Sequence, residues 1–154
     1  MEREPEYGIC RLIQTWVAER LRTSDAVRSA DAQVESQDEG DYEAKLMQGL
    51  AKHRGIMALV SVLGLARGTN GLWEVALEVQ IQEQVNMNRS GPTNEWTAMR
   101  FAEMVLATFH TAQMPSAPFA YFQASQEAIA LEVETPVLVY RVRFAARLGS
   151  TLTF

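Results

Sequence analysis

The sequence predicts an α+β protein with a mostly antiparallel sheet of about four or five strands and helices packed on one face. Two observations predict this fold class. Helical periodicity occupies separate stretches of the chain, and strand-like alternation comes in consecutive runs rather than one strand per helix. Consecutive strands favour an antiparallel sheet, whereas regular alternation with helices would favour a parallel one. With 154 residues, we expect residues 1–154 to form a single domain.

The first helix is predicted over residues 9–22, followed by an exit at residues 23–25. Its apolar residues recur at the three- and four-residue spacing of one helical face: Ile9, Leu12, Ile13, Trp16, Val17 and Leu21. A loop at about residues 25–41 follows, with a short strand around residues 33–36. Residues 31–43 contain acidic but no basic side chains, which fits a solvated loop or a surface for a partner.

The centre of the chain predicts a helix and a β-hairpin. Asp41 is a suitable N-cap for a short helix over residues 42–54. Residues 56–65 are apolar at nearly every position, which indicates a strand buried on both faces. A glycine-containing turn at residues 68–71 leads into a long strand over residues 72–86.

This long strand has one apolar face and one polar face, because side chains alternate across an extended chain. The apolar set is Trp73, Val75, Leu77, Val79 and Ile81, and the polar set is Glu74, Ala76, Glu78, Gln80 and Gln82. We expect Glu74 and Glu78 to lie on a solvated sheet face.

The remainder predicts one long helix and further strands. The helix begins near Thr93 or Asn94 and ends at Met114, before Pro115. Short strands are predicted over residues 119–123, 128–134 and 137–145. We expect Glu132 and Glu134 to lie on a solvated sheet face, with cross-strand pairing to Arg141 and Arg143 as the alternative. The tail, residues 148–154, carries no charge and is expected to extend from the domain.

No catalytic, cofactor-binding or metal-binding residues are predicted. The two histidines lack acidic or cysteine neighbours at ligand spacing, and the single cysteine, Cys10, lies in the first predicted helix. The net charge of −5 disfavours a dedicated nucleic-acid binder. The longest apolar run is too short to cross a membrane. We therefore expect a non-enzymatic, soluble protein without cofactors and without membrane contact.

Several features instead favour assembly. The strand over residues 72–86 is unusually long and contains no lysine, so its edge would be poorly defended against pairing. Residues 31–43 and 72–84 are only acidic, whereas residues 136–154 contain arginines and no acid. Opposite charges at opposite ends of a chain suit a head-to-tail contact, which can close into a ring.

The order of elements resembles that of phage tail terminator (tail completion, neck) proteins. The resemblance covers the helix at residues 9–22, the segment "GIMALVSVLG", the long two-faced strand, the helix in "TNEWTAMRFAEMVLATFH" and the closing "PVLVYRVRFAAR". It implies a virion protein, assembled in the host cytoplasm, that forms a homo-oligomeric ring, commonly a hexamer. Such a ring caps the tail tube, contacts the tube protein and the head-connector proteins, and lets DNA pass through its channel without specific binding.

Under this resemblance, Glu74, Glu78 and Glu83 are candidates for the channel wall. The candidates for the subunit interface are Arg141, Arg143, Arg147, Leu152 and Phe154. Three alternatives stay open at this point. The first is another neck or tail structural protein, such as a head-completion protein or a tube subunit. The second is a small α+β enzyme whose site the sequence does not reveal, and the third is a monomeric or dimeric α+β adaptor.

Overall fold

The computed structural model of the chain describes residues 8–37, 55–68, 71–85, 96–115, 120–133 and 137–148. In order, the elements are α1 (Ile9–Arg22), α2 (Asp25–Ala30), β1 (Gln33–Ser36), β2 (Ile56–Arg67), β3 (Trp73–Gln84), α5 (Ala98–Phe109), β4 (Ala120–Val133) and β5 (Val137–Leu148). The helix predicted over residues 42–54 and the tail beyond Leu148 lie outside the described residues.

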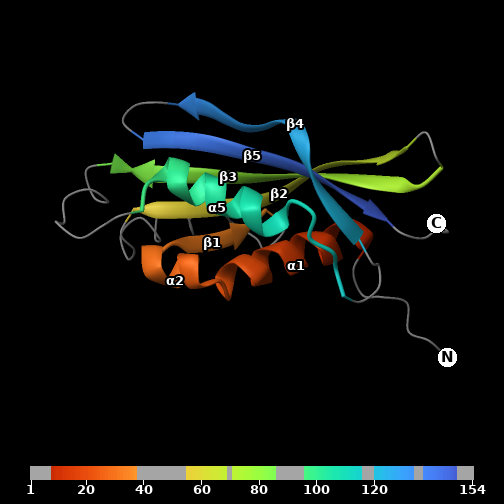
Figure 1. The fold of residues 1–154 in the computed structure, drawn as a ribbon, viewed down its shortest axis with the longest axis horizontal. Coiled ribbons are helices and arrows are strands. Elements are labelled where there is room, and N and C mark those ends of the chain that lie inside the picture. The colour runs from red at the N-terminus through yellow and green to blue at the C-terminus, as the bar shows by residue number, and fades with distance from the viewer. Residues whose placement is uncertain are drawn as a thin grey trace.

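The strands form one five-stranded sheet in the order β1-β2-β3-β5-β4 (Figure 1). β1 pairs with β2 in parallel, and the three other pairings are antiparallel. The predicted α+β class with a mostly antiparallel sheet is therefore confirmed. β3 lies at the centre of this order, so both of its edges are paired, one with β2 and the other with β5.

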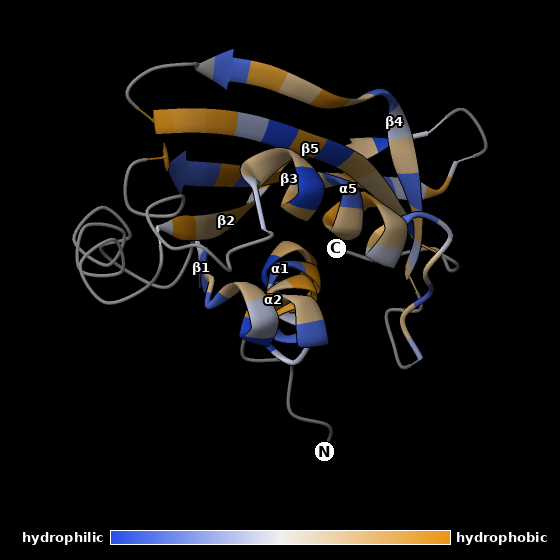
Figure 2. Cartoon of the chain, turned by 60° about the vertical axis from the view of Figure 1, so that its left-hand side comes forward, coloured by the Kyte–Doolittle hydropathy of each residue, from blue (hydrophilic) through white to orange (hydrophobic). Residues whose placement is uncertain are grey.

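Helices α1, α2 and α5 lie on the same side of the sheet (Figure 2). α1 packs on β1 and β2, and α5 packs on β3, β4 and β5. The apolar side of β3 faces these helices, and its residues Val75, Leu77, Val79 and Ile81 are buried as predicted. We call this the helix face of the sheet and the opposite side its outer face.

An aromatic cluster joins the two long helices to the sheet. Phe109 of α5 stacks on Phe144 of β5, with ring centroids 5.3 Å apart. Trp16 of α1 stacks on Phe122 of β4 at 5.2 Å, and Phe122 also contacts Phe109 and Phe144. Large rings contribute much buried area and prefer offset or tilted contacts, so this cluster fixes how the helices sit on the sheet.

The structure adds a helix that the sequence interpretation missed. α1 ends before residues 23–25, as predicted. Ser24 is also the N-cap of α2, because its side chain accepts a hydrogen bond from the Val27 amide. Serine is among the preferred N-cap residues, so the signal was present in the sequence. The short strand around residues 33–36 is confirmed as β1, after a left-handed turn at Asp31.

The prediction that the first strand of the hairpin is buried on both faces is correct only for its first half. Residues 56–61 of β2 are buried, whereas most of residues 62–67 are partly or fully exposed. β1 pairs with β2 only as far as Val60, so the second half extends beyond this cover.

The last part of the chain differs from prediction in two ways. α5 ends at Phe109 rather than Met114, because the backbone turns at Thr111 (φ 69°) and residues 112–114 run along β4. The two short strands predicted around residues 119–123 and 128–134 form one strand, β4. Its pairing with β5 is interrupted between Ala124 and Ile129, which accounts for the gap in the alternation.

Glu83 is completely buried, so the prediction that it lies on an exposed wall is wrong. It follows Ile81 by two residues on β3 and therefore shares the helix face. Its carboxylate accepts a 2.9 Å hydrogen bond from the backbone amide of Ala98, the first residue of α5. A helix N-terminus has unpaired amides and partial positive charge, and a carboxylate satisfies both.

We predict that Glu83→Ala lowers the free energy of unfolding by about 1–3 kcal/mol, because the buried Ala98 amide loses its acceptor. Glu83→Gln keeps an oxygen acceptor and should lose less. Urea denaturation measures both. Thr97→Ala, which removes the side-chain cap to the Arg100 amide, is a control expected to lose about 1 kcal/mol. Wild-type stability in Glu83→Ala would contradict the capping role.

Candidate functional site

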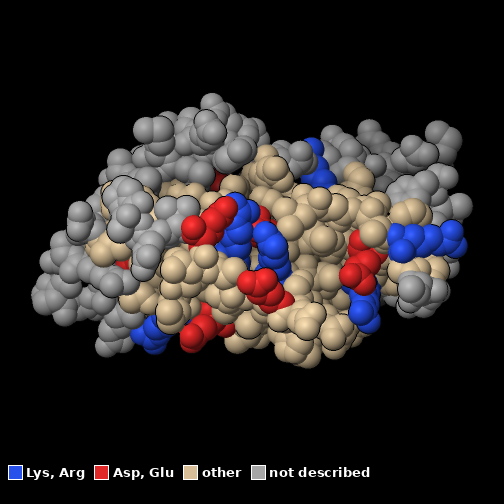
Figure 3. Space-filling view, turned by 90° about the horizontal axis from the view of Figure 1, so that it is seen from above, with Lys and Arg blue, Asp and Glu red and all other residues tan. Residues whose placement is uncertain are grey.

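The outer face of β3, β5 and β4 gathers the charged residues that the sequence singled out. In the antiparallel register of β3 and β5, Glu74 lies opposite Arg147, and Glu78 lies opposite Arg143. Arg141 is one step further along the same face, opposite Gln80. Figure 3 shows acidic and basic side chains lying against each other in separate groups on the surface seen there.

Glu78 is the centre of the first group. Arg141 Nη1 lies 2.9 Å from both carboxylate oxygens of Glu78, and Arg143 Nε donates to Oε1 at 3.3 Å. Arg141 also donates through Nε to Glu132 on β4. One arginine on β5 therefore joins carboxylates of both neighbouring strands, and we call these four residues the outer-face ion cluster.

The expectation that Glu78 is solvated is wrong, because its residue exposure is only 3%. A buried charge is tolerated when it is paired and its hydrogen-bonding positions are filled, and Glu78 meets both conditions. For Glu132, the structure shows the alternative, the cross-strand pair with Arg141. Glu134, its predicted companion, lies outside the described residues.

Two members of the cluster, Glu132 and Arg141, have shifted pKa values. The hydrogen bond from Arg141 holds the pKa of Glu132 below its ordinary value. The hydrogen bonds to Glu132 and Glu78 raise the pKa of Arg141, so its charge is fixed at any physiological pH. With two arginines and two carboxylates, the cluster carries no net charge.

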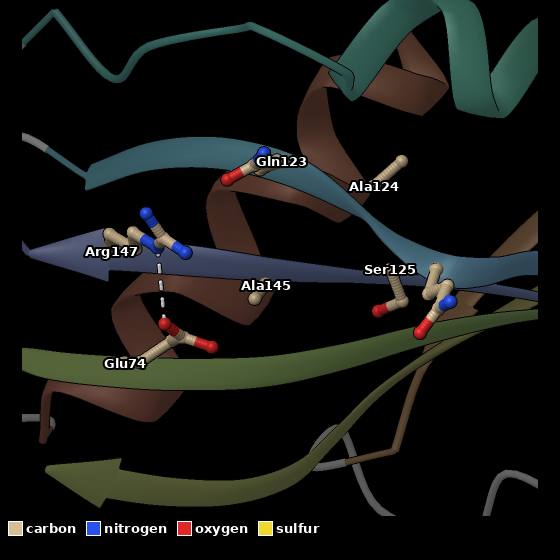
Figure 4. A pocket seen from close by; sticks show the side chains of 7 residues that line it. Glu74, Gln123, Ala124, Ser125, Ala145 and Arg147 are labelled. Carbon is tan, nitrogen blue, oxygen red and sulfur yellow. Dashed lines mark hydrogen bonds and ion pairs between the residues drawn. The ribbon is translucent and has the colours of Figure 1, made fainter. Parts of the chain in front are cut away.

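Glu74 and Arg147 form a second, more exposed pair, joined by a 3.2 Å hydrogen bond from Arg147 Nε. They line an open depression of about 310 Å³ together with Ala145 and the β4 residues Gln123, Ala124, Ser125 and Gln126 (Figure 4). The interruption of β4 after Ala124 brings this polar segment to the depression. The lining therefore presents amide, hydroxyl and paired ionic groups to solvent.

Of the five residues predicted for the subunit interface, the structure describes the three arginines. Arg141, Arg143 and Arg147 all pair with carboxylates of their own chain. The acidic strand and the basic strand thus meet inside one subunit, because β5 is the direct neighbour of β3. Leu152 and Phe154 lie outside the described residues.

Among the described residues, no group of three or more His, Cys, Asp or Glu side chains is placed to hold a metal ion. Across the same residues, no helix has the length and apolar character needed to cross a membrane.

Comparison with known proteins adds no relative. No protein-family model matches the chain, and no curated protein matches it.

We predict strong coupling between Glu78 and Arg141 in a double-mutant cycle. Alanine at both positions, singly and together, should give a coupling free energy of about 1–3 kcal/mol, because either single variant leaves a poorly compensated charge. Urea denaturation of the four proteins measures it.

The exposed pair Arg28–Asp25 is a matched control, expected to couple by about 0.2–1 kcal/mol and to lose that coupling in 1 M NaCl. The coupling of Glu78 and Arg141 should persist in high salt because Glu78 is buried. Equal and equally salt-sensitive coupling in the two pairs would contradict the buried character of the cluster.

Proposed function

We propose that the chain is a structural subunit of a phage tail or neck, of the tail terminator kind. In this proposal, copies form a ring, with a hexamer as the expected size. The ring caps the tail tube, contacts the head-connector proteins and surrounds the channel through which DNA passes. The outer face of β3, β5 and β4 forms the channel wall.

One observation carries this proposal. Arg141, Arg143 and Arg147 lie on the outer face, and each is held by a carboxylate of the same chain. Nonspecific DNA binding depends on cations that replace the counterions of the phosphates. Arginines already engaged by Glu78, Glu132 and Glu74 are poor partners for phosphate, so this polar face would let DNA slide along it.

The assignment of wall residues changes with the structure. Glu74 and Glu78 remain candidates, together with the arginines that pair with them. Glu83 leaves the set because it lies on the helix face beneath α5.

The connection between β2 and β3 favours a terminator over a tube subunit. Tube subunits tend to carry a longer hairpin loop for stacking on the next ring. Here the turn is short: the Gly71 amide donates to the Gly68 carbonyl, and the Gly68 amide donates to the Leu72 carbonyl.

We predict that the purified protein forms rings, alone at high concentration or when mixed with tail tubes, and that the outer face lines the central hole. The test combines light scattering with negative-stain imaging of an Ala76→Cys variant labelled with a small gold cluster. Ala76 is exposed on the outer face of β3, and the background carries Cys10→Ser. The label should appear in the central hole.

Glu103→Cys, on an exposed position of α5, is the matched control, and its label should appear away from the hole. A protein that stays monomeric at every concentration and ignores tail tubes would overturn the proposal. Rings with the Ala76→Cys label at their periphery would support the proposed ring but would contradict the assignment of the outer face to the channel wall.

A further inference from the structure

Among the described residues, the two outermost long strands of the sheet have pairing partners on their outward edges over only part of their length, and at opposite ends. β1 covers β2 at residues 57–60, and the Gln37 amide extends this cover with a bond to the Val60 carbonyl. In the described part of the chain, no strand pairs with the outward edge of residues 61–67, which lead to the β2–β3 turn at the right of Figure 1.

The edge of β4 is covered at the end nearer that turn. The Met114 amide donates to the Ala120 carbonyl, the Phe122 amide donates to the Ala112 carbonyl, and His110 Nδ1 accepts from the Ala124 amide. For residues 125–133, which run toward the upper left of Figure 1, the described residues provide no strand on the outward side.

The open edge of β2 lacks the usual protection against pairing. Leu63 is 53% exposed, and a Cβ added at Gly64 would have no atom within 4 Å. Of residues 61–67, only Arg67 is charged. Edge strands that do not pair are normally guarded by several charges, by proline or by covering segments, so this edge is suited to receive another strand.

The open edge of β4 has matching character. Leu131 is 46% exposed, Ile129 and Ala130 are partly exposed, and Glu127 is an exposed acid. Each open edge therefore offers one well-exposed leucine. The β2 segment carries one basic residue, Arg67, and the β4 segment carries two acids: Glu132, which Arg141 of the same chain already binds, and Glu127.

We infer that residues 61–67 of one copy pair, antiparallel, with residues 127–133 of a second copy, with Leu63 opposite Leu131. This inference rests on the proposed ring and names the edges that build it. Within one chain, β4 runs opposite to β2, because three antiparallel pairings separate them. A second copy in the same orientation therefore brings its β4 antiparallel to β2.

The faces of the residues agree in this register beyond Leu63, at which the pairing of β2 with β3 shifts between Val62 and Gly64. Leu65 and Ile129 face each other, and both lie on the helix face, because they pair with Val75 and Val142 in their own sheets. Gly64 and Ala130 also face each other, and both belong to the outer face. A slip by one residue would break both matches.

The same register brings Arg67 near Glu127, which lies in the interrupted segment of β4 between Ala124 and Ile129. Arg67 donates a long 3.4 Å hydrogen bond to the Gly71 carbonyl, and its guanidinium is on the exposed end of β2. An opposite-charge cross-strand pair stabilises a pairing and disfavours like-charged alternatives. The β2 edge thus fits the β4 edge better than it fits a second β2 edge, where Arg67 residues would have no acid.

This contact is heterologous, since it joins two different edges, and each copy keeps one open edge of each kind for the next. Heterologous contacts continue from copy to copy until they close. Because the open edges lie at opposite ends of the sheet, neighbouring copies are offset along the strands. Such an offset is what tilts the strands of a closed sheet relative to its axis.

Cysteine cross-linking tests the inference directly. Leu63→Cys and Leu131→Cys variants, each with Cys10→Ser, are mixed and treated with a mild oxidant or a short bismaleimide. We expect dimers that contain one copy of each variant, and a ladder of larger species from the double variant. Dimers of Leu63→Cys alone would instead show two-fold pairing of β2 edges and overturn the inference.

Charge exchange gives an independent readout. Arg67→Glu or Glu127→Arg alone should raise the protein concentration needed for half-maximal assembly about tenfold, and the double exchange should return it to within about threefold of wild type. Glu103→Arg on α5 is the control and should leave assembly unchanged. Circular dichroism checks that each variant folds.

The outcomes separate this inference from the proposed function. In one outcome, rings form without a cross-link between positions 63 and 131 and without a response to the charge exchange. This result would overturn the edge pairing but would still support the proposed ring. A chain that forms no oligomer in any condition would overturn both.

Discussion

The aromatic contacts between the helices and one face of the sheet determine the rest of this structure. Phe109, Phe122 and Phe144 bring α5, β4 and β5 together, and Trp16 adds α1 to the same cluster. Because both long helices use this one face for burial, the opposite face holds, beside the buried Met57 and Leu59 of β2, the charged side chains of β3, β5 and β4. Those side chains must then find partners on neighbouring strands.

The arginines of β5 supply those partners. Glu78 is nearly inaccessible to solvent, yet two guanidinium groups compensate its charge, and one of them also binds Glu132. Buried ion pairs add little net stability compared with apolar packing, so their value here lies in a polar surface whose charges cancel. This property connects the ion cluster to the proposed channel wall, where free cations would hold DNA.

The edges of the sheet relate the fold to assembly. Among the described residues, β1 and residues 110–114 protect β2 and β4 at opposite ends, and each of the remaining edge segments exposes a leucine. When the two edges of a sheet differ, each copy can bind the next through the same pair of edges, so that one kind of contact repeats along the assembly. The proposed ring uses these edges, whereas the proposed wall uses the outer face, so the two roles occupy separate surfaces of one sheet.

The sequence by itself determined what depends on neighbours along the chain. The bounds of α1 and the two faces of β3 follow from local periodicity, and so did the α+β class. Tertiary structure decided the partners: Glu78 and Arg141 are 63 residues apart, and only the strand order β3-β5 brings them together. Glu83 shows the same limit of reasoning from the sequence. Alternation along β3 places it on the apolar face, but only the position of α5 supplies the Ala98 amide that makes the burial of its carboxylate favourable. Periodicity is a property of adjacent residues, whereas strand order and helix placement depend on how distant segments pack.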